Sequence, residues 1–391
     1  MNLRRKLLLA SIAAATIGLA PTLGPASALG QNAPYRIGTV LSVTGPGAFL
    51  GDHMKRGMEL AIEEINAKGG INGHKIEWAF YDAETQASKA VTATRRLIEQ
   101  DKVDIIVGGG NASGLALAMV PIVEKAQIPF ISTEGSMQIV NPVAERRWTF
   151  KSTLDDDKVL ERAADSFAKR GITSIAMLYD SSGFGQSAKE QLEKVGPKRG
   201  LKVLYETFNP GDTDLTAQLT RIKASDAKAI ICWTITPAGV VFIKQAKQLG
   251  LGDRVIMHSY GFVDDRYMKQ SEGAAEGIDL MSQKFPVGTD LPASDPLKQR
   301  IADITARFEK RFNTRPNQFV AQTYDAIYMA ADVLAKGGND KEKVRTALEN
   351  LKDFKGVGGS FTFTPASHSG LTKDDAVVIN WKNNGWRLAN Y

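Results

Sequence analysis

Short apolar segments alternate with longer amphipathic segments from residue 35 to residue 258. Strands are predicted at residues 35–41, 75–81, 103–107, 128–132, 174–179, 202–207, 229–233 and 254–258. Helices are predicted between them at residues 52–68, 88–100, 113–126, 155–170, 186–199, 215–224 and 237–250. Strands that are apolar through most of their length are buried on both faces of a sheet. The alternation therefore predicts an α/β fold in which helices cover doubly wound parallel sheets.

The last part of the chain has a different order of elements. Helical patterns follow one another at residues 295–312, 318–336 and 341–350. Strand patterns then occupy residues 359–363, 376–382 and 386–388. The chain has 391 residues, a length that favours two domains over one.

The first 28 residues have the features of a secretory signal peptide. Arg4, Arg5 and Lys6 precede an uncharged apolar run at residues 7–19, and Ala26-Ser27-Ala28 fits a signal peptidase site. The apolar run is shorter than the roughly 20 residues that a membrane-spanning helix needs. We therefore expect cleavage after Ala28 and a periplasmic protein.

Charge and cysteine content narrow the range of partners. The net charge is +6, half of it from the three basic residues of the leader, and no basic block follows. No nucleic-acid partner is expected from such a pattern. Cys232 is the only cysteine and lies in the apolar run 229–233, so we expect a buried, inert thiol. Because no cysteine directly follows the leader to carry a lipid, we expect a freely diffusing protein, and we expect it to be a monomer.

Known catalytic and metal-binding motifs do not fit the sequence. The stretch 108–113 follows a strand and opens a helix, but Ser113 stands where a dinucleotide fingerprint needs its third glycine. Phosphate-binding P-loops and the G-x-S-x-G nucleophile elbow are absent. The four histidines show no metal-ligand spacing, and Asp155-Asp156-Asp157 is interpreted as an acidic helix start. We expect no enzyme activity, no cofactor and no metal.

Two serines mark a candidate anion site. Ser113 opens a helix after one strand, and Ser136 follows the next strand along the chain. Ligands of doubly wound sheets bind beyond the carboxyl ends of the strands, and amides at a helix start attract anions. Serine and glycine are also ordinary helix caps, so spacing alone leaves both interpretations open.

Several segments resemble leucine/isoleucine/valine-type periplasmic binding proteins in the same order. The most distinctive is residues 56–73, RGMELAIEEINAKGGING, followed by similar segments at 42–46, 81–83, 129–132, 179–185 and 273–277. The resemblance implies two lobes joined by three hinge crossings, near Thr149, Asp279 and Asp375. Lobe one would be 33–148 plus 280–374, and lobe two would be 149–279 plus 375–391. The family delivers small molecules to the membrane permease of ABC-type importers.

The resemblance also implies which residues bind the ligand. Ser113 and Ser136 match the hydroxyl ligands of a substrate carboxylate, and Glu134 and Gly135 lie where backbone groups contribute. The other matching positions, which cover or line the space between the lobes, are Phe49, Leu50, Phe184, Thr236, Tyr260 and, more weakly, Tyr324.

Tyr260 is a departure from the amino-acid binders of this family. Those proteins place an acidic residue at the matching position, where it neutralises the ammonium group of the ligand. A phenol cannot supply that charge, so an aromatic or aliphatic acid without an amine is as compatible as an amino acid. Glu134 could substitute if its side chain turned into the cleft. A second class of function, an exported sensor that presents a small acid or amide to a membrane receptor, would use the same fold.

Overall fold

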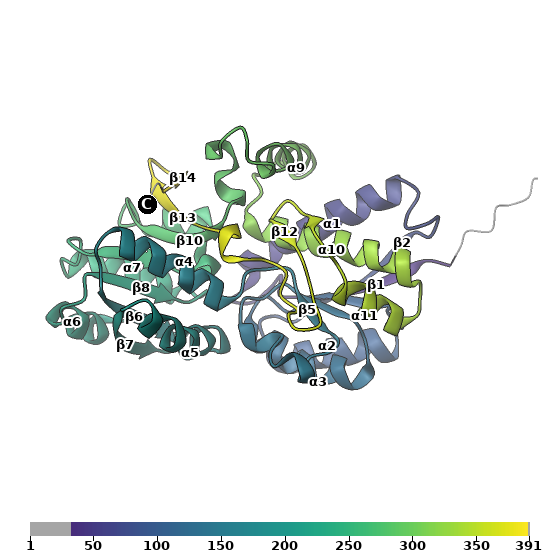
Figure 1. Ribbon diagram of the computed structural model, residues 1–391, viewed down its shortest axis with the longest axis horizontal. Coiled ribbons are helices and arrows are strands. Elements are labelled where there is room, and N and C mark those ends of the chain that lie inside the picture. Colours follow the sequence, from purple (N-terminus) through teal and green to yellow (C-terminus); the bar gives the residue numbers. More distant parts are fainter. Residues whose placement is uncertain (1–32, 390–391) are drawn as a thin grey trace, which may run out of the picture.

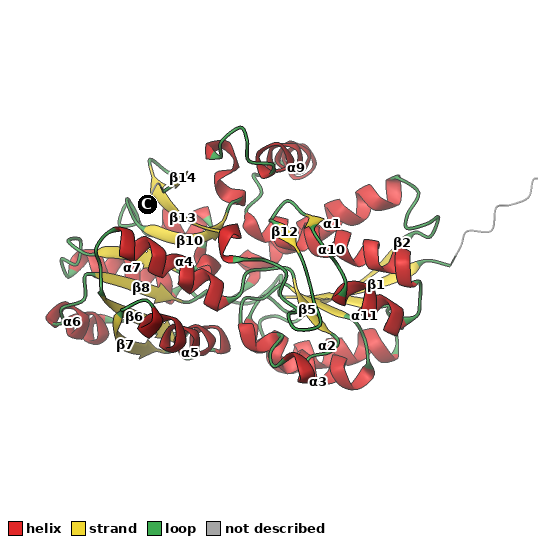
Figure 2. Ribbon diagram, in the orientation of Figure 1, coloured by secondary structure: helices red, strands yellow, loops and turns green. Residues whose placement is uncertain are grey.

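Two α/β lobes lie side by side in the computed structural model, which describes residues 33–389 (Figure 1). The leader predicted at residues 1–28 lies outside the described residues. Among residues 33–389, no helix combines the length and apolar character required to cross a bilayer. In each lobe, a central sheet is flanked by helices (Figure 2).

The first lobe is built on a parallel sheet with strand order β2-β1-β3-β4-β5. Its strands are β1 (Tyr35–Leu41), β2 (Ile76–Asp82), β3 (Ile105–Gly108), β4 (Phe130–Ser132) and β5 (Thr149–Lys151). One face packs against α2 (Ala87–Glu99) and α3 (Ser113–Ala126). The other face packs against α1 (Ala48–Ala67) and α10 (Gln318–Gly337), with α9 (Leu297–Phe312) and α11 (Lys341–Glu349) beside them.

The second lobe has a mixed sheet with strand order β14-β13-β10-β9-β8-β6-β7. Its strands are β6 (Ser174–Asp180), β7 (Lys202–Phe208), β8 (Ala229–Trp233), β9 (Val255–His258), β10 (Asp279–Gln283), β13 (Ala376–Lys382) and β14 (Gly385–Leu388). Helices α4 (Asp156–Lys169) and α5 (Gly183–Lys198) cover one face. The other face carries α6 (Thr216–Ala224), α7 (Ala238–Gln248) and α8 (Asp265–Gln270).

The sheets agree with the predicted α/β fold, with two differences at strands. β13 and β14 run antiparallel to their neighbours, because the chain returns into the second lobe beside β10 and then turns back on itself. The strand predicted at residues 359–363 is reduced to β12 (Ser360–Phe361), which pairs with β11 (Phe354–Lys355) in a small separate hairpin.

The described chain passes between the lobes after β5, after β10 and before β13. β5 pairs with β4 in the first sheet, although the sequence-based ranges place Thr149 in lobe two. Residues 280–283 of β10 pair in the second sheet, although those ranges place them in lobe one. Both differences have one cause: the crossings lie just after each short strand rather than before it. The remaining lobe boundaries stay a proposal.

The apolar core is continuous from one lobe to the other. One cluster of buried side chains runs from the α1 and α10 face of the first sheet to the α4 and α5 face of the second. Cys232 is fully buried in the separate cluster on the opposite face of the second sheet, as predicted for an inert thiol.

Candidate functional site

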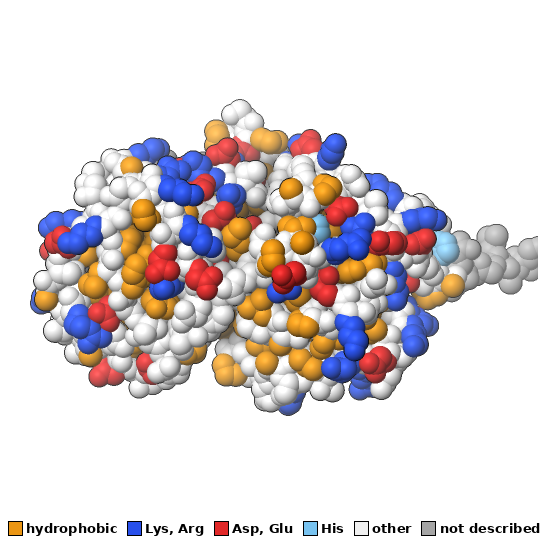
Figure 3. Space-filling model, turned by 60° about the horizontal axis from the view of Figure 1, so that its bottom comes forward, with side chains coloured by type: hydrophobic (Ala, Val, Ile, Leu, Met, Phe, Trp, Pro, Cys, Tyr) orange, Lys and Arg blue, Asp and Glu red, His pale blue; other side chains and the backbone are white. Residues whose placement is uncertain are grey.

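A small cavity of about 40 Å³ lies between the lobes, at the carboxyl ends of β3, β4 and β9. A volume of roughly 10–15 Å³ is enough for one water molecule, so the cavity holds only a few water-sized groups. Residues of both lobes and of the first crossing line it: Leu50, Met54, Asn111, Ala112, Ser113, Thr133, Glu134, Gly135, Thr153, Phe184, Ile235, Tyr260, Gly261, Phe319 and Gln322. The surface is notched where the lobes meet (Figure 3).

Ser113 lines this cavity and contacts Ser136, which is not a lining residue but directly follows the lining residue Gly135. The Ser136 amide donates to Ser113 Oγ at 3.1 Å, and both serines are buried. Ser136 Oγ in turn accepts the Gln138 amide at 3.2 Å. Since Ser113 Oγ accepts one hydrogen bond, its own O–H group remains a donor. This donor lies at the first residue of α3, where backbone amides have no helical partner. The arrangement suits an anion.

Lys151 is fully buried beside Gly135 and Ser136. Its ammonium donates to the Gly135 carbonyl at 2.5 Å and the Ser136 carbonyl at 3.3 Å. It also pairs with Asp155 at 2.5 Å. The peptide group that joins Gly135 to Ser136 therefore accepts from a cation at its carbonyl and donates to Ser113 through its amide. Hydrogen bonds in such chains polarise one another, which strengthens the donor character of Ser113.

The Glu134 carboxylate is turned back into the first lobe. Its oxygens accept from the Ser132 hydroxyl, the Thr133 amide and hydroxyl, and the Asn111 amide at 2.7 to 3.1 Å. These four hydrogen bonds use the acceptor capacity of a carboxylate. Burial raises the pKa of Glu134, and the hydroxyls of Ser132 and Thr133 lower it in part. All four hydrogen bonds of the Glu134 carboxylate are therefore made within the first lobe.

Tyr260 closes the cavity from the second lobe. Its hydroxyl lies 3.2 Å from both the Leu154 carbonyl and Asp156 Oδ1. Burial raises its pKa well above the ordinary value, so it stays neutral. A Cβ atom on Gly135 would overlap this hydroxyl and would lie 2.8 Å from the Phe184 ring. Only glycine at residue 135 allows Tyr260 to approach this closely.

The acidic run at the start of α4 does not act as a helix cap. Asp155, the N-cap residue, makes no side-chain cap hydrogen bond and pairs with Lys151 instead. Asp156 accepts from the Ser187 hydroxyl at 2.5 Å. Burial raises the pKa of Asp156 to about 7, against the lowering effects of Lys151 and Ser187. The acidic run therefore begins α4 as predicted, but the side chains of Asp155 and Asp156 bond Lys151 and Ser187 instead of capping the helix.

Four predicted positions do not line the cavity: Ser136, described above, and Phe49, Thr236 and Tyr324. The Phe49 ring packs on Tyr267 at a centroid distance of 4.4 Å. Thr236 lines a wider apolar space of about 470 Å³ at the mouth of the cleft, together with Pro46, Pro210 and Pro237. The Tyr324 hydroxyl donates to Glu64 at 2.7 Å, away from the cavity.

Several lining residues were not predicted as ligand positions. Asn111 and Thr133 lie in the same loops as Ser113 and Ser136. The sequence pointed to these loops but not to the side chains of Asn111 and Thr133. Thr153 follows β5 in the first crossing. Its neighbours along the chain are mostly polar, so nothing in the local sequence marks it as a residue that contacts a ligand. Phe319 and Gln322 come from α10, whose inward face could be recognised only by its position in the fold.

Comparison with known proteins shows the same family throughout. Residues 34–385 match the periplasmic binding protein family. A Leu/Ile/Val-binding protein homolog of Brucella abortus is 26% identical over 361 residues, covering 88% of this chain and 86% of that protein. The leucine-, isoleucine-, valine-, threonine- and alanine-binding protein of Pseudomonas aeruginosa is also 26% identical, covering 88% of this chain and 89% of that protein.

Solved structures share the fold. An extracellular ligand-binding receptor from Rhodopseudomonas palustris superimposes with a TM-score of 0.84 at 22% identity, covering 92% of this chain and all of that one. The substrate binding protein LivJ of Streptococcus pneumoniae, in complex with isoleucine, gives 0.79 at 25% identity, covering 91% and 99%. These relatives are binding proteins rather than enzymes. The chain therefore belongs to the periplasmic binding protein family, alongside the Leu/Ile/Val-binding proteins.

Proposed function

We propose that this protein is the periplasmic solute-binding component of an ABC-type importer and that it holds a small carboxylate between its lobes. The observation that carries the proposal is the position of Ser113 in the interlobe cavity at the start of α3, where its hydroxyl oxygen accepts the Ser136 amide. Hydroxyl and amide donors at a helix N-terminus stabilise a carboxylate that closure removes from water. The ligand reaches a membrane permease, and the protein acts as a freely diffusing monomer released from its leader.

The same geometry favours an acid without an ammonium group. Tyr260 is neutral, and the hydrogen-bonding capacity of Glu134 is used within its own lobe. An ammonium group buried without a free charged acceptor is strongly disfavoured. The apolar body of the acid, aromatic or aliphatic, is larger than the few water-sized groups that fit the cavity, so lining side chains such as Phe184, Phe319 and Leu50 would move to admit it. A branched-chain amino acid, which the names of the relatives suggest, is the competing ligand.

Replacing the two serines tests the proposal. Ser113→Ala and Ser136→Ala should each weaken binding of a carboxylate by roughly 1.5–3 kcal/mol, the value of a hydrogen bond to a charged group. Isothermal titration calorimetry measures the loss, after a thermal-shift screen of amino acids and simple acids has identified a ligand. Ser294→Ala, on an exposed loop, is the matched control. Unchanged affinity in both cleft variants would refute the placement of the carboxylate.

A further inference from the structure

Two buried polar atoms around the interlobe cavity have no hydrogen-bond partner among the described residues. They are Asn111 Oδ1 and Thr153 Oγ1. Asn111 is 4% exposed and Thr153 is 1% exposed, and both residues line the cavity. Asn111 comes from the first lobe, and Thr153 comes from the crossing that follows β5. Buried polar groups are nearly always hydrogen bonded, so an unsatisfied pair beside a binding cavity indicates a ligand contact.

The orientation of the Asn111 amide is fixed by its neighbours. Its Nδ2 donates to the Ser42 carbonyl at 2.6 Å and to the Gly47 carbonyl at 3.3 Å. A flipped amide would place Oδ1 against two carbonyl oxygens, so the flip is excluded. The backbone amide of Asn111 also donates to Glu134, at a φ of 71°. The side chain therefore presents an acceptor, Oδ1, as its unsatisfied end.

The two atoms together match the hydrogen-bonding capacity of a hydroxyl group. A hydroxyl donates one hydrogen bond, which Asn111 Oδ1 can accept, and it accepts one, which Thr153 can donate. An ammonium group has three donors and no acceptor. It would also need the one carboxylate among the described lining residues, Glu134, which already accepts four hydrogen bonds.

We propose that Asn111 and Thr153 bind a hydroxyl group of the ligand, and that the ligand is a 2-hydroxy acid. This inference rests on the proposed function, since it takes the carboxylate to be held by Ser113. Both groups face one cavity of about 40 Å³, which requires the hydroxyl and the carboxylate to be close together on the ligand. Asn111 and Thr153 are therefore residues that determine specificity within the carboxylate site.

Three series of acids test the proposal, each with one carbon skeleton and a hydroxyl, a hydrogen or an amine at carbon 2. They are lactate, propionate and alanine; 2-hydroxy-4-methylpentanoate, 4-methylpentanoate and leucine; and mandelate, phenylacetate and phenylglycine. In the series that binds best, calorimetry should show the hydroxy acid binding about tenfold or more tightly than both analogues, since each leaves a buried group unpaired. Tightest binding by the amino acid, or equal binding of the hydroxy and deoxy acids, overturns the proposal.

Two variants separate this inference from the proposed function. Thr153→Val removes the hydroxyl at constant size; it should weaken binding of the hydroxy acid about tenfold and leave the deoxy acid unchanged. Asn111→Ala removes the acceptor and should lower the ratio of hydroxy-acid affinity to deoxy-acid affinity, a ratio that the accompanying loss of the hydrogen bonds to Ser42 and Gly47 does not by itself change. If the preference for the hydroxy acid over the deoxy acid survives both variants, the inference is contradicted. If only Ser113→Ala weakens binding, the result supports the carboxylate site alone. If no acid of the nine binds, both proposals fail.

Discussion

At the scale of single residues, the site depends on which polar atoms are already satisfied. Glu134 could be named from the sequence, but its direction could not, because four hydrogen bonds within the first lobe decide it. Ser113 was predictable because a serine that opens a helix after a strand is a local signal. Asn111 and Thr153 were not predictable, because only the folded structure shows that Asn111 Oδ1 and Thr153 Oγ1 have no hydrogen-bond partner among the described residues.

Gly135 gives a direct test of lobe closure at this scale. Gly135→Ala places a methyl group against the Tyr260 hydroxyl and the Phe184 ring. Because the overlap exists only when the lobes are closed, we expect at least about a tenfold loss of ligand affinity with little change in the stability of the unliganded protein. Small-angle scattering should show that ligand no longer compacts the variant. Gly252→Ala, in open space on the second lobe, is the control; normal affinity of Gly135→Ala would show that Tyr260 does not approach residue 135 on closure.

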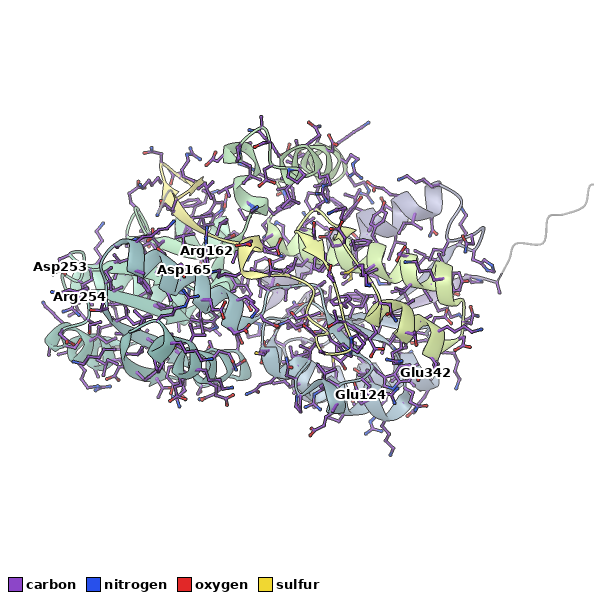
Figure 4. All side chains as sticks on the ribbon, viewed as in Figure 1. Glu124, Arg162, Asp165, Asp253, Arg254 and Glu342 are labelled. Atoms are coloured by element: carbon purple, nitrogen blue, oxygen red, sulfur yellow. The ribbon has the colours of Figure 1, made fainter. Side chains whose placement is uncertain are left out.

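At the scale of elements, the long amphipathic helices and apolar strands were predicted closely, and the short strands at the crossings were missed. β5 contains the buried Lys151, and β10 contains the buried polar residues Asp279, Ser282 and Gln283. Neither strand has the apolar run that identifies buried strands in a sequence. Tertiary contacts hold them instead: Glu124 of α3, labelled in Figure 4, accepts from the Thr149 hydroxyl at 2.6 Å.

The first and third crossings are also fixed to α4. Asp165, labelled in Figure 4, accepts from Lys373 at 2.8 Å, which joins α4 to the segment that leads into β13. Lys151 at the end of β5 bonds Asp155, the residue before α4. The hinge therefore contains one buried ion pair, Lys151 with Asp155, and one partly exposed ion pair, Lys373 with Asp165.

Lys151 provides a prediction about this hinge. Lys151→Met leaves Asp155 buried without its partner, and should lower the free energy of unfolding by roughly 3–5 kcal/mol. The double variant with Asp155→Asn removes both charges and should recover most of that stability in chemical denaturation. Affinity for the carboxylate should stay reduced in the double variant, because the Gly135 carbonyl has lost its cation. Full recovery of affinity would show that Lys151 has only a structural role.

At the scale of the whole molecule, direct contacts between residues of the two lobes hold the lobes together. Asn317 at the start of α10 donates to Asp264 of the second lobe at 3.1 Å. Arg266 bonds the Phe49 carbonyl, and the Phe49 ring packs on Tyr267. The family and the two-lobed fold followed from sequence segments in a fixed order, but this closed arrangement did not, because it depends on pairs of residues more than 50 positions apart.

The central claim is that a carboxylate is held at the start of α3 inside the closed cleft. A crystal structure of the protein with its tightest-binding acid tests this claim most directly. We expect one carboxylate oxygen within about 3 Å of Ser113 Oγ, the distance of an ordinary hydrogen bond, with Tyr260 packed against Gly135. A ligand whose carboxylate lies elsewhere, with Ser113 bonded only to protein, would contradict the account.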